Sequence, residues 1–344
     1  MALSTDELEA HLQAVARACP DPVAGLFGPR SMSWRIARES GLFLGGGRAA
    51  LLQLAHPWVA QAVAHHSATR TDPLGRLTRT FRHVHAMVFG DLDTALRTAR
   101  GVHKIHTRIT GTLDHATGAF PQGSPYEANQ TEALAWVHAT LIDSAVRVHD
   151  LLLPGLSYTE KDTYYQESKR FAALFGIPPG SLPDRWEHFQ TYCTAMQSSG
   201  ALAVGPACQE LAGFLLAPRG GPLDPLLPGF RVFTAALLPA SLREPLGFHY
   251  SPQDERWFSR ACHALRVLYP RVPRRLRDVP DYTEARRRLQ GRPARDRLGR
   301  ALQASLFHAM VPPPEGHGHR GIGAAPLMQH VRNVLGVVRG SDRP

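Results

Sequence analysis

The chain has 344 residues, of which 43% are hydrophobic and 20% are charged. This composition excludes an intrinsically disordered chain and supplies enough apolar side chains for a globular core. The net charge of +10, from 39 lysines and arginines against 29 acids, suits anionic partners such as nucleic acid, membrane surfaces or acidic ligands. Acidic residues interrupt the densest basic stretch, Arg271–Arg300, so we expect a solvated surface there rather than a polyanion site.

Helical periodicity dominates from the first residues, where Ser4 and Thr5 precede acidic side chains in the pattern of a helix start. Prolines and glycines mark the boundaries between successive helices. We predict helices at Ser33–Glu39, Arg48–His66, Pro73–Phe89, Leu92–Thr110, Thr131–Leu152, Thr159–Phe175, Pro183–Gln197, Pro206–Leu216, Pro225–Leu238 and Pro252–Leu268. The fold class is therefore all-α, with one large helical domain over residues 1–310 and an irregular, basic, Pro/Gly/His-rich tail over 311–344.

The most apolar stretch, Leu42–Val63, contains Arg48, His56 and Pro57 as well as three glycines. A lipid-spanning helix needs about 20 nearly uninterrupted apolar residues, so we expect no membrane span, although peripheral membrane contact stays open. The four cysteines are well separated, with no CxxC pair, and no secretory signal pattern opens the chain. These features favour reduced cysteines and a cytoplasmic location.

The helix that begins at Leu92 carries a histidine within its apolar stripe. At about 100° per residue, His106 falls between Val102 and Ile109 on that stripe. A single imidazole on a core face is commonly a hydrogen-bonded core histidine. The alternative is an axial haem ligand, which must be a neutral imidazole on an apolar wall. His103, at the edge of the stripe, is the local rival.

Two further histidines occupy similar positions. His138 lies on the apolar stripe of the predicted helix Thr131–Leu152, where it is a second ligand, a partner for a cofactor carboxylate, or a core residue. His56, directly before Pro57, is a third candidate, and local backbone would serve as its partner equally well.

Other cofactor and catalytic signatures are missing from the sequence. We find no HExxH, CxxC or ExxH pair, no phosphate-binding loop with its lysine, and no GxSxG. One GxGxxG string, Gly316–Gly321, follows a run of prolines instead of a strand, so its context excludes a dinucleotide site. This elimination favours a haem cofactor, but elimination alone does not establish one.

The segment "RLTRTFRHVH", residues 76–85, places Arg76, Arg79, Thr80 and His83 on a stripe beside the apolar stripe of its helix. A water-facing basic surface is one interpretation. The other is a cavity wall, because arginine offers two parallel N–H groups that bind the propionates of haem or another anion. Periodicity alone does not separate the two.

Five segments in order carry a family resemblance. They are "GPRSMSWRIARESGLFLGGGRAALLQLAHPWVAQAVAHHS", "DPLGRLTRTFRHVHAMVFGD", "VHKIHTRITG", "YEANQTEALAWVHATLIDSAV" and "LSYTEKDTYYQES". This order and spacing resemble the rubber-oxygenase/MpaB-type oxygenase catalytic-domain family, which includes the latex-clearing proteins, and the resemblance runs from about Gly28 to Met196.

The resemblance implies an all-helical fold with a globin-like core that holds a b-type haem. It implies His106 as the proximal iron ligand, and Arg76 and Thr80 as matches to the family's R-x-x-K-T motif. Arg79 fills the position of the lysine, which is a distal-side residue in rubber-cleaving members. We assign catalytic roles to Arg76, Arg79 and Thr80, cofactor contacts to His106, His138 and Arg76, and the metal bond to His106.

The function that we expect is a haem b-dependent oxygenase or related oxidoreductase, which acts on an apolar small molecule or lipid-like substrate with O2 or peroxide. The alternative is a non-catalytic protein that binds haem or a hydrophobic ligand. A helical regulator that binds nucleic acid through Arg271–Arg300 ranks last, because no recognition helix or aromatic platform supports it.

Overall fold

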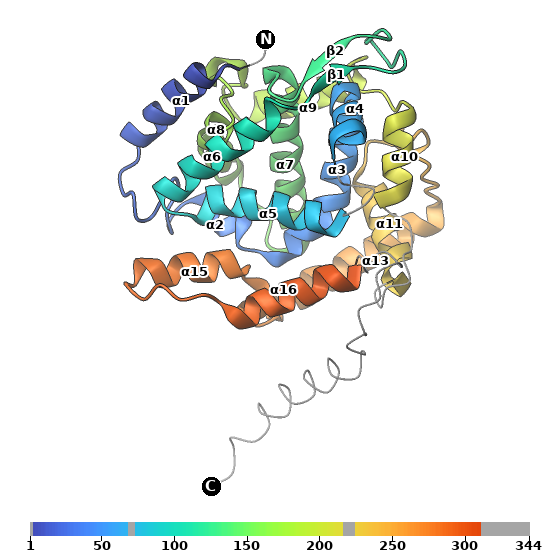
Figure 1. Ribbon diagram of the computed structural model, residues 1–344. Coiled ribbons are helices and arrows are strands. Elements are labelled where there is room, and N and C mark those ends of the chain that lie inside the picture. The colour runs from blue at the N-terminus through green and yellow to red at the C-terminus, as the bar shows by residue number, and fades with distance from the viewer. Residues whose placement is uncertain (1–2, 68–72, 216–223, 311–344) are drawn as a thin grey trace, which may run out of the picture. The chain divides into compact units, whose positions relative to one another are not determined.

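The computed structural model describes residues 3–67, 73–215 and 224–310, and side chains are not described for 73–78 and 306–310. The prediction of an all-α fold is confirmed (Figure 1). The α-helices of the first half are α1 (Thr5–Arg17), α2 (Met32–Ala37), α3 (Gly46–Leu54), α4 (Pro57–His66), α5 (Pro73–Phe89), α6 (Leu92–His106), α7 (Thr131–Leu152) and α8 (Tyr158–Ala173). Those of the second half are α9 (Trp186–Ser198), α10 (Pro206–Leu215), α11 (Leu227–Leu237), α12 (Ala240–Arg243), α13 (Pro252–Leu268), α14 (Arg274–Arg277), α15 (Pro280–Leu289) and α16 (Arg297–Met310).

Short elements join these helices. Four 3-10 turns occur, namely η1 (Ser40–Gly45), η2 (Pro179–Ser181), η3 (Asp224–Leu226) and η4 (Tyr269–Arg271). A two-stranded antiparallel hairpin of β1 (Thr110–Thr112) and β2 (Pro125–Glu127) pairs Gly111 with Tyr126. The sequence analysis did not predict this hairpin, and it is the reason that α6 ends at His106 and not at Thr110.

The helix predicted over Arg48–His66 is two helices. The prediction of one continuous helix was wrong, because α3 ends at Leu54 and α4 begins at Pro57. Proline lacks an N–H and its ring clashes with the preceding turn, so Pro57 is acceptable as the first residue of a helix but not within one. The break leaves His56 in an extended conformation as the N-cap residue of α4.

Helix α7 is the central element of the bundle. It lies between α3 and α8 in Figure 1 and contacts both, as well as η1 and α13. Trp136 is fully buried on α7, and its indole N–H donates to the carbonyl of Leu52 on α3 at 2.8 Å. The main core cluster forms where α7, α3, α9 and α10 meet.

A buried ion pair connects α3 to α7. The Arg48 side chain is 1% exposed, and its guanidinium reaches Asp143 at 2.5 Å and the hydroxyl of Ser144 at 2.7 Å, both on α7. The same guanidinium donates to the carbonyl of Leu237, the last residue of α11, at 2.8 Å. Burial lowers the pKa of Arg48, and the nearby carboxylate of Asp143 opposes that shift.

Helices α5 and α6 form an antiparallel pair on one side of the bundle. Asp91 caps α6 by accepting from the N–H of Thr94 at 2.8 Å, and the turn between the two helices is only two residues long. The second core cluster packs the apolar stripes of both helices against Trp34, whose indole N–H donates to the carbonyl of Val88 at 2.9 Å. This pairing places the face of α5 that carries His83 beside α6.

Helices α15 and α16 also pack on α5, as Figure 1 shows, and the sequence analysis predicted neither. His85 on α5 bonds to Asp281 on α15 at 3.0 Å, and Arg300 on α16 bonds to the same carboxylate at 2.9 Å. These two partners overcome burial and hold the pKa of Asp281 at about 2. No helix within the described ranges is long and apolar enough to cross a membrane. The globin-like core and the boundary at residue 310 stay predictions, and the tail 311–344 lies outside the described residues.

We predict that Asp143→Ala lowers the free energy of unfolding by about 3 to 5 kcal/mol, because it leaves the Arg48 charge buried without its carboxylate. Urea unfolding followed by circular dichroism measures this change. Asp93→Ala, which removes a solvent-exposed pair with Arg97, serves as the control and should change stability by less than about 0.5 kcal/mol. Equal effects of the two substitutions would refute the structural role of the buried pair.

Candidate functional site

The candidate site lies where the end of α6 meets α5 and the segment before α7. His106 is the last residue of α6, and Asn129 lies two residues before α7. The side chain of Asn129 is 4% exposed and hydrogen-bonds the imidazole of His106. Its Nδ2 donates to the backbone carbonyl of His103 at 3.4 Å, and its bond to His106 favours the protonated ring, as an accepting Oδ1 does. Asn129 therefore fixes both the end of α6 and the orientation of the His106 ring.

The His106 imidazole is neutral at physiological pH. Its pKa is lowered to about 4, mainly by partial burial and then by the nearby His103 and His83. The hydrogen bond to Asn129 works in the opposite direction, because the amide oxygen favours a protonated ring nitrogen. A neutral ring that donates one N–H to Asn129 carries a lone pair on its other nitrogen. That nitrogen has the chemistry of a metal ligand.

Helix α5 supplies the polar face next to His106. His83 is half-buried, and its pKa is lowered by burial and then by the cationic Arg82 and Arg79. His83 in turn acts electrostatically on His106. Arg79 and Thr80 lie one turn before His83 and are exposed. Arg79 is therefore near enough to His83, and His83 to His106, for each to act electrostatically on the next, while the side chain of Arg76 lies outside the described part of α5.

His103 is buried on the same helix, three residues before His106. Burial lowers its pKa, and its Nε2 has no hydrogen-bond partner among the described residues. His103, the alternative to His106 in the sequence analysis, is therefore a second imidazole of lowered pKa on the same helix. It differs from His106 because its ring has no bond to Asn129.

His138 occupies a different place, between α7 and α8. Its Nε2 donates to the carbonyl of Ser168 at 3.1 Å, and its ring stacks on Phe171 at a centroid distance of 6.4 Å. Burial lowers its pKa to about 4, and its Nδ1 has no hydrogen-bond partner among the described residues. None of the described contacts joins His138 to His106. A hydrogen bond to a carbonyl and a stacked aromatic ring are typical of a core histidine. That role was one of the three alternatives for His138 in the sequence analysis.

His56 is fully buried beside Trp58 and Phe120, with ring centroids at 5.5 Å in both cases. Both of its ring nitrogens lack a hydrogen-bond partner within the described ranges, and burial lowers its pKa to about 4. The sequence analysis allowed a hydrogen bond from His56 to the local backbone, and the described residues make no such bond.

The sequence analysis did not identify Asn129. Its signal was slight, an amide in "YEANQTEA" just before a helix, and helix-wheel arguments apply only to residues within helices. The polar cluster around the hairpin was missed for the same reason. There the imidazole of His65 bridges Tyr126 at 3.1 Å and Asp114 at 2.9 Å.

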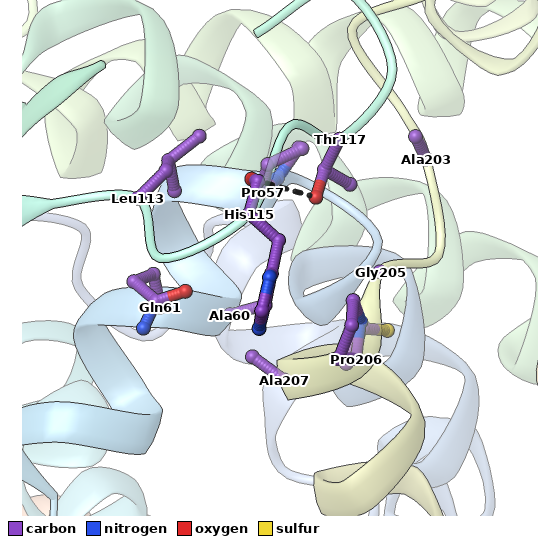
Figure 2. A pocket seen from close by; sticks show the side chains of 11 residues that line it. Pro57, Ala60, Gln61, Leu113, His115, Thr117, Ala203, Gly205, Pro206 and Ala207 are labelled. Atoms are coloured by element: carbon purple, nitrogen blue, oxygen red, sulfur yellow. Dashed lines mark hydrogen bonds between the residues drawn. The ribbon is translucent and has the colours of Figure 1, made fainter. Parts of the chain in front are cut away.

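Two cavities lie away from His106. Figure 2 shows the smaller one, between α4, the loop after β1 and the start of α10, where the His115 ring reaches between Ala60 and Ala207. Its volume of about 10 Å³ suits a single water molecule. The larger, of about 250 Å³, lies against α1 and α8 and is lined by His11, Leu26 and Lys169 among others.

The described residues contain no group of three or more His, Cys, Asp or Glu side chains arranged to hold a bare metal ion. An axial haem ligand requires only one imidazole, because the porphyrin supplies the other four nitrogens. The orientation and neutrality of His106 fit that requirement.

Comparison with known proteins identifies the class. A family model matches residues 34–267, about two-thirds of the chain, and its description is an oxygenase catalytic domain. The protein is therefore an all-α enzyme with oxygenase activity. It belongs to the family described as ER-bound oxygenase mpaB/B'/Rubber oxygenase, catalytic domain, as the five ordered segments indicated. No curated protein and no solved structure matches the chain.

The depressed pKa of His56 predicts that stability falls as the pH drops from 6.5 to 4. An unfolded histidine binds a proton below about pH 6.5, whereas folded His56 does so only near pH 4. Because the unfolded state binds more protons in this window, acid favours unfolding. His56→Leu removes this effect, so between pH 7 and pH 4.5 the variant should lose about 2 to 3 kcal/mol less unfolding free energy than the wild type.

Urea unfolding at the two pH values measures the difference, and His188→Leu, at an exposed position on α9, is the matched control. Equal pH dependence in the wild type and His56→Leu would contradict the neutral state of His56.

Proposed function

We propose that the protein is a haem b-dependent oxygenase that acts on an apolar or lipid-like small molecule, with His106 as the proximal ligand. The observation that carries this proposal is the neutral His106 ring, whose N–H is directed to the buried amide of Asn129. Metal-binding histidines characteristically donate their second ring nitrogen to such a partner, which fixes the tautomer and the ring orientation.

Haem, when bound, supplies the iron for dioxygen or peroxide chemistry. The task of the chain is to hold, orient and enclose it. His106 would offer one nitrogen to the iron, and Asn129 would keep the other protonated. Burial lowers the pKa of His103 and of His83, which disfavours positive charge next to His106.

The cationic side chains of α5 are proposed to bind the propionates or to act on the distal side. Arg79 is the best-supported candidate, because its charge acts on His83, which in turn acts on His106. Arg76 and Thr80 join it through their places in the R-x-x-K-T-like motif, and Thr80 would orient the neighbouring groups by hydrogen bonding. The only support for a second cofactor contact by His138 is its Nδ1, which has no hydrogen-bond partner among the described residues.

The substrate class rests on the resemblance to rubber-cleaving oxygenases. O2 or peroxide is the expected co-substrate. A cytoplasmic location is proposed because the four cysteines are free thiols. Peripheral contact with a membrane would bring an apolar substrate within reach.

His106→Ala should abolish stoichiometric haem binding, because no other described residue combines a neutral ring with the Asn129 bond. The measurement is the Soret band and the haem content of purified protein expressed with haem supplied, and far-UV circular dichroism verifies the fold. His103→Ala is the matched control and should retain haem. A full Soret band with equal haem stoichiometry in His106→Ala would refute the ligand assignment.

Arg79→Met should weaken haem binding about 10- to 150-fold, since one charge-assisted bidentate hydrogen bond contributes roughly 1.5 to 3 kcal/mol. Arg79→Lys should recover part of that loss, because it keeps the positive charge but not the two parallel N–H groups. Haem titration followed by absorbance gives the dissociation constants, with Arg97→Met on the exposed surface of α6 as the control. Unchanged affinity in Arg79→Met would remove Arg79 from the site.

A further inference from the structure

Helix α13 presents one face to the bundle and a second, large face to solvent. Phe258 packs against Phe233 of α11 at a centroid distance of 5.1 Å, and Leu265 and Tyr269 pack beside the buried residues of α7. No residue of this 17-residue helix is fully buried. Its outer face is therefore as extensive as its inner one.

The outer face of α13 carries large apolar side chains. Trp257 is 45% exposed, Val267 42% and Leu268 60%, and at 100° per residue the three fall within one third of the helix circumference. Leu276 on the next helix, α14, is also exposed, at 57%. Isolated exposed apolar residues need no explanation, but a group that continues along one helix face marks a binding surface.

Arginines alternate with these apolar residues. Residues 252–276 contain six arginines against two acids, Asp254 and Glu255. Both acids already have partners, since Asp254 caps α13 through Ser251 and Glu255 accepts from the hydroxyl of Tyr250. Among the described residues, no hydrogen bond or ion pair engages the guanidinium groups of the four exposed arginines Arg256, Arg260, Arg274 and Arg275.

We propose that this surface of α13, formed by Trp257, Val267 and Leu268 with Arg256 and Arg260, docks the protein onto an anionic lipid bilayer. A helix face that combines tryptophan and leucine with arginine places its apolar groups at the headgroup boundary, while the cations meet anionic lipids. This surface gives a location to the peripheral membrane contact in the proposed function and rests on it in that respect, but nothing in the surface depends on a cofactor.

The observed composition favours a bilayer over other occupants. A nucleic acid would use the arginines but would leave three large apolar side chains without a partner. A second copy of the chain in a symmetric contact would bring like charges together. The chain's own residues 311–344 carry four arginines against two acids, so their charge does not complement this face.

The test is co-sedimentation of the purified full-length protein with vesicles of phosphatidylcholine alone and of phosphatidylcholine with phosphatidylglycerol. Binding should require phosphatidylglycerol and weaken as the salt rises from about 0.1 M to about 0.5 M. Arg256→Ser/Arg260→Ser should lower the partition coefficient about 30-fold, since each arginine near an anionic surface contributes a factor of roughly five. Val267→Ser/Leu268→Ser should lower it about tenfold.

Matched controls remove the same kinds of side chain elsewhere. Arg17→Ser/Arg97→Ser takes two exposed arginines from α1 and α6, and Val23→Ser/Tyr158→Ser takes two exposed apolar residues from outside α13. Both should bind as the wild type does. Brominated lipids should quench the fluorescence of Trp257, and Trp257→Phe should lose that part of the quenching while it still binds.

Three results would overturn the proposal: no binding to either vesicle, equal losses in the α13 variants and their controls, or quenching that is unchanged in Trp257→Phe. Preferential binding of double-stranded DNA that depends on the arginines but not on Val267 and Leu268 would also overturn it, in favour of a polyanion site. Haem content, measured in parallel, reports on the proposed function separately, so that either idea can fail alone.

Discussion

The buried charge of Arg48 is the constraint on which the rest of the structure depends. A guanidinium that is 1% exposed must find partners in fixed directions, and it finds them in the side chains of Asp143 and Ser144 and in the last carbonyl of α11. Apolar contacts alone would let α7 slide or rotate against α3 at little cost, whereas a displaced Arg48 would leave a charge unpaired in the core. The ion pair therefore fixes the register of α7 against its neighbours, although its net contribution to stability is modest.

The position of α7 determines the geometry at His106. Asn129 lies directly before α7, in the segment that leaves the β-hairpin, and its amide contacts both the His103 carbonyl and the His106 ring. The hairpin starts four residues after His106, and its two strands are hydrogen-bonded to each other. This pairing holds the end of α6 close to the start of α7. A small rotation of α7 would move Asn129 and with it the imidazole. The orientation of the His106 ring thus depends on α7, a helix that contains neither His106 nor Asn129.

The sequence predicted those elements whose signals are local. The bounds of α5, α7 and α13 agree with the predicted ones, because each has a proline, a cap or a glycine at its ends and a regular apolar stripe between them. The break at His56 was missed because the apolar pattern runs through it, and proline at a first helical turn looks the same as proline within a helix. Helices α15 and α16 lie in an arginine-rich segment that was interpreted as a solvated surface, and tertiary ion pairs such as that of Arg300 with Asp281 hold them against α5. The family resemblance, in contrast, required only the order of short motifs, and the match over residues 34–267 confirms it.

The candidate histidines show where periodicity stops being informative. His56, His106 and His138 all lie on apolar surfaces, and burial lowers the pKa of each to about 4, so all three are neutral imidazoles. Among the described residues, His56 has no hydrogen-bond partner, His138 bonds to a helix carbonyl, and the ring of His106 bonds to a buried side-chain amide. A helix carbonyl is available at almost any core position, whereas a buried amide directed at one ring nitrogen is a costly arrangement that requires a specific residue between two elements. The distinguishing feature of the His106 site is therefore its partner, which lies 23 positions later in the sequence and which only the folded chain brings into contact.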